Sequence, residues 1–201
     1  MDFFKKVFRK VGGIFWSVFL FVRNHFFFRQ LGRFKKEEKE EITFKGLTKN
    51  NKKDFFLLYK ELNNGSEIRG FRRLLINLFS EKCILAAYYG RELIGFDYFY
   101  FNQKDFQDST IHEGFVGVKK SYRKKGIANN FRSISTKHFA SYHLGVSTRI
   151  STNNIPSINS AFKNGFKIKE TYIEDNGEER NYLVFQRGVK PNGTRSYAKD
   201  F

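Results

Sequence analysis

The chain has 201 residues, of which 40% are apolar and 28% charged, a composition that fits one α/β globular domain with an appended segment. Its 37 Lys and Arg outnumber 20 Asp and Glu, giving a formal charge of +17, which predicts an anionic partner such as nucleic acid, anionic lipid or a phosphate-rich cofactor. A single cysteine excludes an intrachain disulfide, and the four histidines lack the spacing of a metal site.

The first 36 residues differ in composition from the rest, because they hold nine Lys or Arg against one Asp and ten of the 26 Phe. Their apolar residues share one helical face, namely Phe4, Val7, Phe8, Val11 and Phe15. The uncharged residues 11–22 would span only about 18 Å as a helix, less than the roughly 30 Å hydrocarbon core of a bilayer. We therefore predict that residues 1–32 form a basic aromatic helix that lies on a membrane, or re-enters it, without crossing.

Two other interpretations of this segment were weighed. A basic start before an apolar stretch is typical of a signal peptide, but Arg23 follows directly and no small-residue cleavage site is present. The segment can also form an extra core helix, although Phe-rich helices flanked by arginine suit the headgroup region better than a core. Positive charge on both flanks favours the cytoplasmic side for both ends, so we expect a cytoplasmic protein bound peripherally to the inner (plasma) membrane.

The elements that follow alternate between strand and helix. The charged run KKEEKEE predicts a solvated linker, or the outer end of a helix, so a linker is placed at residues 33–41. The domain is expected at residues 42–188, followed by a flexible tail at 189–201. Within it, strands are predicted at residues 42–47, 83–89, 92–101, 110–118, 144–150, 166–173 and 180–185, and helices at 48–63, 66–79, 125–142 and 154–164.

Residues 116–131 combine a strand, a basic loop and the start of a helix. The first turn of a helix has unpaired N–H groups and the positive end of the helix dipole. Gly126 lets the backbone approach a ligand closely, and Ala128 keeps the next turn small. The surrounding cations are Lys119, Lys120, Arg123, Lys124 and Lys125. This pattern favours a pyrophosphate site, with an ordinary basic strand-to-helix turn as the alternative.

The pattern Arg123-x-x-Gly126-x-Ala128 resembles the acetyl-CoA-binding motif of the GNAT family of N-acetyltransferases. Residues 154–166 resemble the second cofactor motif of that family, a helix opened by Asn and closed by Gly-Phe. The predicted order of elements over residues 42–187 also matches the family. The resemblance implies the GNAT fold, a mixed and mostly antiparallel central sheet with helices on both faces. It also implies acetyl-CoA-dependent N-acetylation of a primary amine.

The resemblance also implies where the cofactor lies. Pantetheine would occupy the V between two splayed strands, here residues 110–118 and 144–150. The pantetheine amides would pair with the backbone of Val116, Gly117 and Val118. The pyrophosphate would be held by the backbone N–H groups of Arg123, Lys124, Lys125, Gly126, Ile127 and Ala128. Asn154 and Ser157 of the second motif complete the expected contacts.

Two positions depart from the family pattern. Members often carry a Glu eleven residues before the motif Arg, and His112 stands there in this chain. Its neighbour Glu113 would point to the opposite face of a regular strand, but a bulge can exchange them, so both are candidate bases, with His112 slightly preferred. Ala161 stands where many members place a Tyr general acid. The thiolate then leaves unaided, takes its proton from another residue such as Tyr98, Tyr100 or Tyr142, or catalysis is weak.

The acceptor is expected near residues 63–72 and the acidic turn at 174–179, whose carboxylates either attract an ammonium group or are simply solvated. A membrane-bound arm favours an amine made at the membrane, such as an amino sugar or a glycolipid precursor of the cell envelope, over a peptide amine. The alternatives are a basic membrane- or nucleic-acid-binding protein and a catalytically degenerate CoA-binding domain. Nucleic acid is less favoured because the arm is strongly apolar.

Overall fold

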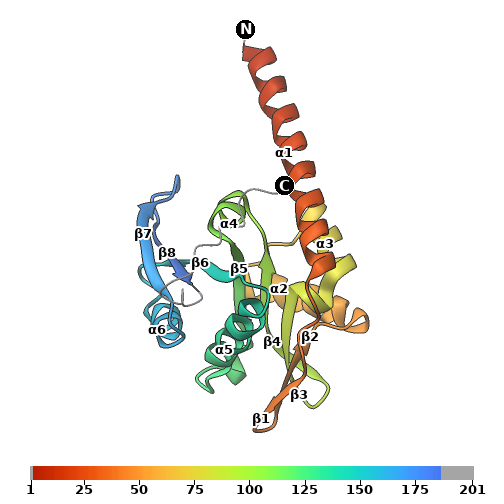
Figure 1. Cartoon of the computed structure of the whole chain (residues 1–201), viewed down its shortest axis with the longest axis vertical. Coiled ribbons are helices and arrows are strands. Elements are labelled where there is room, and N and C mark those ends of the chain that lie inside the picture. Colours follow the sequence, from red (N-terminus) through yellow and green to blue (C-terminus); the bar gives the residue numbers. More distant parts are fainter. Residues whose placement is uncertain (1, 187–201) are drawn as a thin grey trace.

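The computed structural model describes residues 2–186, with residues 2–14 described by their backbone alone (Figure 1). The tail expected at residues 189–201 lies outside the described residues, as do the side chains at the start of the first helix. The strands are β1 (Glu37–Lys39), β2 (Ile42–Gly46), β3 (Ile84–Tyr89), β4 (Glu92–Tyr100), β5 (Thr110–Val118), β6 (Gly145–Ser151), β7 (Lys167–Ile173) and β8 (Glu179–Phe185). The α-helices are α1 (Asp2–Gln30), α2 (Lys52–Leu62), α3 (Gly70–Cys83), α4 (Gln103–Asp108), α5 (Ile127–Ala140) and α6 (Ile155–Lys163), with 3-10 turns at Lys49–Asn51 and Lys120–Tyr122.

The strands form one sheet in the order β1-β2-β3-β4-β5-β6-β8-β7. Neighbours run antiparallel except β5 and β6, which run parallel. Helices cover both faces: Gly95 of β4 faces Phe131 of α5, whereas the next residue, Phe96, contacts the ring of Phe55 of α2. A mixed, mostly antiparallel sheet with helices on both faces is therefore confirmed, and the elements from β2 to β8 follow the predicted order with α4 added.

Burial along the strands follows from this covering. The central strands β3 and β4 are buried along nearly their whole length, which is why they appear as almost continuous apolar runs in the sequence. Strand β7 at the sheet edge is mostly exposed and alternates charged with apolar residues. The core thus lies around the middle strands, next to the point where β5 and β6 begin to separate.

The C-terminal end of α1 and the residues just after it pack into the domain core. Phe28, Leu31 and Phe34 are at most 5% exposed. Asn24 exchanges two hydrogen bonds of 2.8 Å with the backbone N–H and C=O of Phe101, just beyond the end of β4. The side chain of Asn24 therefore acts as a strand partner that satisfies these buried polar groups. For this part of α1, the structure has the extra core helix that the sequence left as an alternative.

The charged run expected as a linker forms a hairpin instead. Strand β1 pairs antiparallel with β2, from Glu37 opposite Phe44 to Lys39 opposite Ile42. Glu40 takes a positive φ of 54° in the tight turn between them. An edge strand keeps most of its side chains in solvent, so strong charge is compatible with it and also discourages pairing with another chain. The charge pattern concealed this strand because it is typical of a solvated segment.

The sequence pattern does not predict helix α4. It begins with a capping box: the Asn102 side chain accepts from the Asp105 N–H at 3.2 Å, and the Asp105 carboxylate accepts from the Asn102 N–H at 2.9 Å. Asp105 itself is fully buried. The short helix thus brings a carboxylate to the start of β5, where it accepts from the Thr110 hydroxyl at 2.8 Å and takes part in the site described below.

One side of α1 stays exposed. Phe15, Phe19, Val22 and Phe26 project from it, with Phe15 73% exposed. The N-terminal part of the helix extends beyond the rest of the domain, while its C-terminal part runs beside α3 (Figure 1). Among the described residues, no helix combines the length and the apolar character needed to span a bilayer.

Candidate active site

The loop between β5 and α5 folds with two residues in the left-handed region, Lys124 with φ of 66° and Gly126 with φ of 71°. A Cβ on Gly126 would meet nothing within 4 Å, so the backbone conformation, not crowding, requires glycine there. Within the described chain, the N–H groups of residues 124–126 donate no hydrogen bond to another backbone group outside the regular elements. The first N–H groups of α5 lack helical partners by geometry. The loop therefore presents a run of free amides, as an anion-binding nest does.

The cations of this loop are only partly compensated. Lys119 pairs with Glu92 at 2.7 Å, and the Tyr122 hydroxyl donates to the same carboxylate at 2.8 Å. The Nε of Arg123 donates to the Val118 carbonyl at 3.1 Å, which ties the loop back to the end of β5. Among the described residues, Lys120, Arg123, Lys124 and Lys125 form no ion pair. Their charge adds to the helix dipole in favouring an anion.

Strands β5 and β6 separate next to this loop. They pair only from Thr110 opposite Gly145 to Glu113 opposite Thr148. On its other side, β5 stays paired with β4 as far as Val118. The backbone groups of residues 115–118 that point toward β6 are thus left without a strand partner, and Val116, Gly117 and Val118 line the opening. This is the place where the resemblance located the pantetheine.

A β-bulge lies at the point of separation. Tyr98 of β4 pairs with Phe115 and the next residue, Phe99, pairs with Glu113, so Gly114 is the extra residue. A Cβ on Gly114 would collide with the ring of Tyr100, which explains why glycine occupies the bulge. The bulge comes after both His112 and Glu113, so it does not change the face of the sheet to which either side chain points. The two side chains therefore point to opposite faces.

Glu113 points toward α5 and is held there by Arg132. Its carboxylate accepts hydrogen bonds of 3.0 to 3.2 Å from Nε and Nη2 of the guanidinium. The remaining Arg132 donors reach the carbonyl and hydroxyl of Ser157 at 2.8 and 3.0 Å. Ser157 therefore links α6 to this buried pair, and Asn154 caps the same helix by accepting from the Ser157 N–H at 3.3 Å. The sequence pattern did not single out Arg132. The signal that points to it is a charged residue on the apolar face of a predicted helix.

Asp97 of β4 lies fully buried beside this pair. Neither of its carboxyl oxygens has a hydrogen-bond partner among the described residues. Burial, and then the charge of Glu113, raise the pKa of Asp97 well above its ordinary value. Burial therefore favours the protonated, neutral form of this carboxyl more than in an exposed aspartate.

His112 lies on the other face of the sheet, at the end of a hydrogen-bonded chain. Its Nδ1 is 2.9 Å from Ser147 Oγ, and Ser147 donates to Asp105 at 2.6 Å. Because the Ser147 hydrogen goes to the carboxylate, its oxygen must accept from His112, which places the imidazole proton on Nδ1. The lone pair of Nε2 is then free to take a proton. A base positioned by a hydroxyl and a carboxylate follows the logic of hydrolytic triads.

Burial of His112 has an electrostatic consequence. Desolvation, and then the positive charges of Arg149 and Arg72, lower the pKa of His112 from 6.5 to about 3. The imidazole is therefore neutral at physiological pH, and it is a weak base unless a neighbouring anion stabilises its protonated form. The sequence pattern gave no signal for Asp105 and Ser147, which are 42 residues apart and meet only because α4 packs at the start of β5.

The tyrosines named as alternative acids lie in two places. Tyr100 packs edge-on against His112, with ring centroids 5.2 Å apart, and Tyr98 stacks beside it at 5.5 Å. Tyr142 lies elsewhere, because its hydroxyl accepts from the Gly32 N–H at 2.8 Å just beyond α1. Ala161, at the position where the family often has Tyr, is fully buried.

The acidic turn between β7 and β8 is partly compensated, since two of its four carboxylates pair with Arg180. Arg180 contacts Glu174 at 3.1 Å and Glu178 at 2.7 Å. The two carboxylates therefore share one guanidinium, which weakens their attraction for an incoming ammonium group.

Comparisons with known proteins identify the fold. No protein-family model matches the sequence, and no curated protein matches it. Solved structures do match. The Salmonella typhimurium protein yncA, assigned as an acetyltransferase and solved with its cofactor acetyl-CoA, aligns with a TM-score of 0.63 at 12% identity, covering 77% of this chain and 100% of its own. The GNAT-family acetyltransferase of Bacillus anthracis aligns with a TM-score of 0.56 at 14% identity, covering 76% and 98%.

The chain has the GNAT fold. Arabidopsis thaliana Naa50, solved with the bisubstrate analogue CoA-Ac-MVNAL, also matches, with a TM-score of 0.56, 17% identity and coverage of 73% and 99%. Each GNAT neighbour is thus covered almost entirely, whereas about a quarter of this chain lies outside the alignments. In this GNAT fold, the amide-lined loop, the bulge at Gly114 and the imidazole of His112 surround the opening between β5 and β6.

Proposed function

We propose that the protein is an acetyl-CoA-dependent N-acetyltransferase that acts on a primary amine. The observation that carries this proposal is the run of free amides at residues 124–126 and the start of α5, beside splayed strands in a GNAT fold. The GNAT neighbours solved with acetyl-CoA or a CoA-containing analogue add support for the cofactor. Both the geometry and the excess of lysine and arginine match a ligand that carries phosphates.

The cofactor would be held largely by backbone. The N–H groups from Lys124 to Ala128 would bind the pyrophosphate, whereas the N–H of Arg123, also expected there from the sequence, already donates to the Lys120 carbonyl at 3.3 Å. The unpaired edge of β5 at Val116, Gly117 and Val118 would hydrogen-bond the pantetheine amides. These contacts leave the acetyl group near Gly114, where the sheet opens. When bound, acetyl-CoA supplies an activated acyl group with a thiolate leaving group. We propose that Asn154 and Ser157 act indirectly, by fixing α6 and Arg132.

The acceptor face would be the one that holds His112. The amine nitrogen attacks the thioester carbon, the C–S bond breaks, and the nitrogen loses one proton as the amide forms. We propose that Nε2 of His112 takes this proton, directly or through water, and that Ser147 and Asp105 stabilise the resulting imidazolium. Glu113 is already engaged by Arg132, so we propose a structural role for it. With Ala161 at the family tyrosine position, the sulfur leaves as a thiolate that water can protonate.

The exposed side of α1 supports our proposal of membrane attachment. Phe15, Phe19, Val22 and Phe26 recur at helical spacing on the side opposite the packed residues Asn24 and Phe28, and each is at least 45% exposed. Arg29 is exposed near the end of this stripe, as suits a helix lying among anionic headgroups, whereas the guanidinium of Arg23 lies over the Phe106 ring at 3.8 Å. The acceptor would then be a small amine or a glycolipid precursor at the cytoplasmic face of the inner membrane, for example an amino sugar.

Calorimetric titration with acetyl-CoA, followed by acetyl transfer over amino-sugar nucleotides, polyamines and peptides, tests this proposal. We expect binding of the cofactor and turnover with an amino sugar. Binding without transfer to any amine would favour a degenerate CoA-binding domain, and absence of binding would overturn the assignment. Flotation with anionic vesicles, compared with neutral vesicles and RNA retention, tests the role of α1.

A further inference from the structure

We propose that the acceptor carries a phosphate group and an apolar chain, and that it binds in the cavity between α1 and α3. This inference rests on the proposed acetyltransferase function and names the class of its acceptor: a lipid-linked phosphorylated amine. The cavity has a volume of 610 Å³, and the residues that line it include Phe21, Arg69, Phe71, Arg72 and Tyr100.

One aromatic ring, that of Tyr100, separates the cavity from the face of the sheet that holds His112. Tyr100 forms part of its wall, and on its other side the same ring contacts Gly114 closely enough to exclude a Cβ there. The ring of His112 lies 5.2 Å from that of Tyr100. A ligand seated against Tyr100 therefore lies next to both the bulge and the proposed base. An amine on such a ligand needs to extend past only one side chain.

The charges of the cavity favour an anion. Two arginines, Arg69 and Arg72, line it, and no Asp or Glu does. Arg69 makes one 3.4 Å contact with Glu67, whereas Arg72 forms no ion pair among the described residues. The guanidinium of Arg72 lies over the Tyr100 ring, 4.5 Å from its centroid, which orients its donors beside the cavity. Guanidinium groups bind phosphate through paired hydrogen bonds, and a polycationic acceptor would be repelled.

The rest of the cavity wall is apolar and continues onto α1. Phe21 of α1 and Phe71 of α3 pack with ring centroids 5.2 Å apart. Farther along α3, Leu74 and Leu78 are 43% and 49% exposed. A phosphate at Arg72 would thus have an apolar path leading outward between the two helices. If a free sugar phosphate bound at Arg72, the apolar surface between α1 and α3 would remain in contact with water. The geometry therefore favours a phosphate attached to a lipid.

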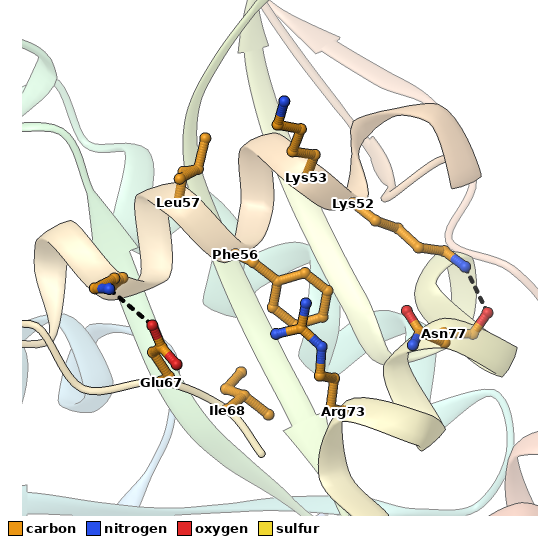
Figure 2. Close-up of a pocket in the computed structure, with 9 residues that line it drawn as sticks. Lys52, Lys53, Phe56, Leu57, Glu67, Ile68, Arg73 and Asn77 are labelled. Atoms are coloured by element: carbon orange, nitrogen blue, oxygen red, sulfur yellow. Dashed lines mark hydrogen bonds and ion pairs between the residues drawn. The ribbon is translucent and has the colours of Figure 1, made fainter. Parts of the chain in front are cut away.

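A second cavity provides a matched comparison (Figure 2). It has a volume of 530 Å³ and lies between α2 and α3, and its lining residues include none from β4, β5 or α1. Lys60 pairs with Glu67, Lys52 donates to the Asn77 carbonyl, and the guanidinium of Arg73 lies over Phe56 at 4.1 Å. Arg73 is therefore a close counterpart of Arg72: it is next in sequence, exposed and stacked on an aromatic ring, but it serves another cavity.

The test uses the full chain and three acceptors of one amino sugar: a short-prenyl phosphate ester, the lipid-free 1-phosphate and a neutral methyl glycoside. We expect the prenyl phosphate to have the lowest KM. Arg72→Ala should raise that KM about tenfold, the equivalent of one lost charge-assisted hydrogen-bond pair. The same variant should leave the KM of the methyl glycoside and the Kd of acetyl-CoA unchanged. Arg73→Ala should change none of these values.

Three results would overturn the inference. They are equal KM values for the phosphate and the neutral glycoside, equal effects of Arg72→Ala and Arg73→Ala, and equal KM values for the prenyl and lipid-free phosphates. The last result alone would assign the cavity to a free phosphate. If no amine is acetylated, calorimetric binding of the prenyl phosphate to the wild type and to both variants still decides the matter. A failure of acetyl-CoA binding would instead count against the proposed function.

Discussion

The guanidinium of Arg132 on α5 holds the carboxylate of Glu113 on β5 through three hydrogen bonds of 3.0, 3.1 and 3.2 Å. Both side chains are almost completely buried, at 2% and 1% exposure. The same guanidinium reaches Ser157 on α6. This contact joins the helix that begins at the amide-lined loop to the strand that opens the V. The relative position of the two halves of the proposed cofactor site thus depends on one ion pair.

Breaking this pair should be costly. Arg132→Met leaves Glu113 charged and buried without a partner, so we expect the free energy of unfolding to fall by about 3 to 5 kcal/mol, measured by urea denaturation. The double variant Glu113→Leu/Arg132→Met should recover much of that loss. As the control, Lys104→Ala removes the exposed pair with Glu170 and should cost no more than about 1 kcal/mol. Equal losses for the buried and exposed pairs would contradict this interpretation.

Gly126 should matter for cofactor binding as well as for backbone conformation. Gly126→Ala forces a left-handed alanine at φ of 71°, which costs about 1 to 2 kcal/mol and displaces amides of the loop. We expect a similar stability loss in Gly177→Ala, where φ is 82° and a Cβ also meets nothing within 4 Å. Only Gly126→Ala should weaken acetyl-CoA binding, by about tenfold or more in calorimetry. An unchanged Kd would separate the loop from the cofactor.

The chain Asp105–Ser147–His112 predicts a specific kinetic pattern. His112→Ala should lower kcat by about 10² to 10⁴, the usual contribution of a general base. Ser147→Ala should lower kcat less and leave the Kd of acetyl-CoA unchanged, because it removes only the contact that fixes the tautomer. The control is Ser135→Ala, a fully buried serine that donates only within its own helix. If Ser135→Ala and Ser147→Ala reduce kcat equally, a positioning role for Ser147 is wrong.

His112 also makes the stability depend on pH. Its pKa is about 3 in the folded chain and 6.5 as its ordinary value, so the unfolded state binds more protons between these values. Stability is then complete above about pH 6.5 and falls as the pH drops toward 3. Thermal denaturation of the wild type and of His112→Gln between pH 4 and 8 measures this, with a shallower slope expected for the variant. Parallel slopes would mean that His112 is not buried as described.

Asp97 should make the stability depend on pH in the opposite direction to His112. Because its pKa is raised, the folded state keeps a proton that the unfolded state loses, so this residue lowers stability as the pH rises above its ordinary pKa of 3.8. Asp97→Asn removes the ionisable group. We expect the variant to gain on the wild type with increasing pH, by at most about 1.4 kcal/mol per pH unit. A constant difference from pH 5 to 9 would show that Asp97 does not titrate abnormally.

The sequence predicted the structure correctly where a pattern of a few neighbouring residues determines the local fold. The pattern from Arg123 to Ala128 predicted the strand, loop and helix found there, because a left-handed glycine and a helix start have local signatures. The periodicity of residues 42–187 predicted nearly every strand and helix. By contrast, β1 was hidden by its charge, and α4 by its length of only six residues. The packing of Asn24 on Phe101 depends on a contact 77 residues away, which no local pattern encodes.

For this protein, the sequence by itself determined the order of elements, the position of the glycine-containing loop before α5 and the resemblance to the GNAT fold. These follow from side-chain periodicity and from backbone preferences over a few residues. Only the tertiary structure decided that Glu113 is neutralised by Arg132, that His112 is oriented through Ser147, and that α1 packs against α3 to form a cavity lined by Arg72. Each of these depends on distant residues meeting in a dry interior, where a charge or a polar group must find its partner.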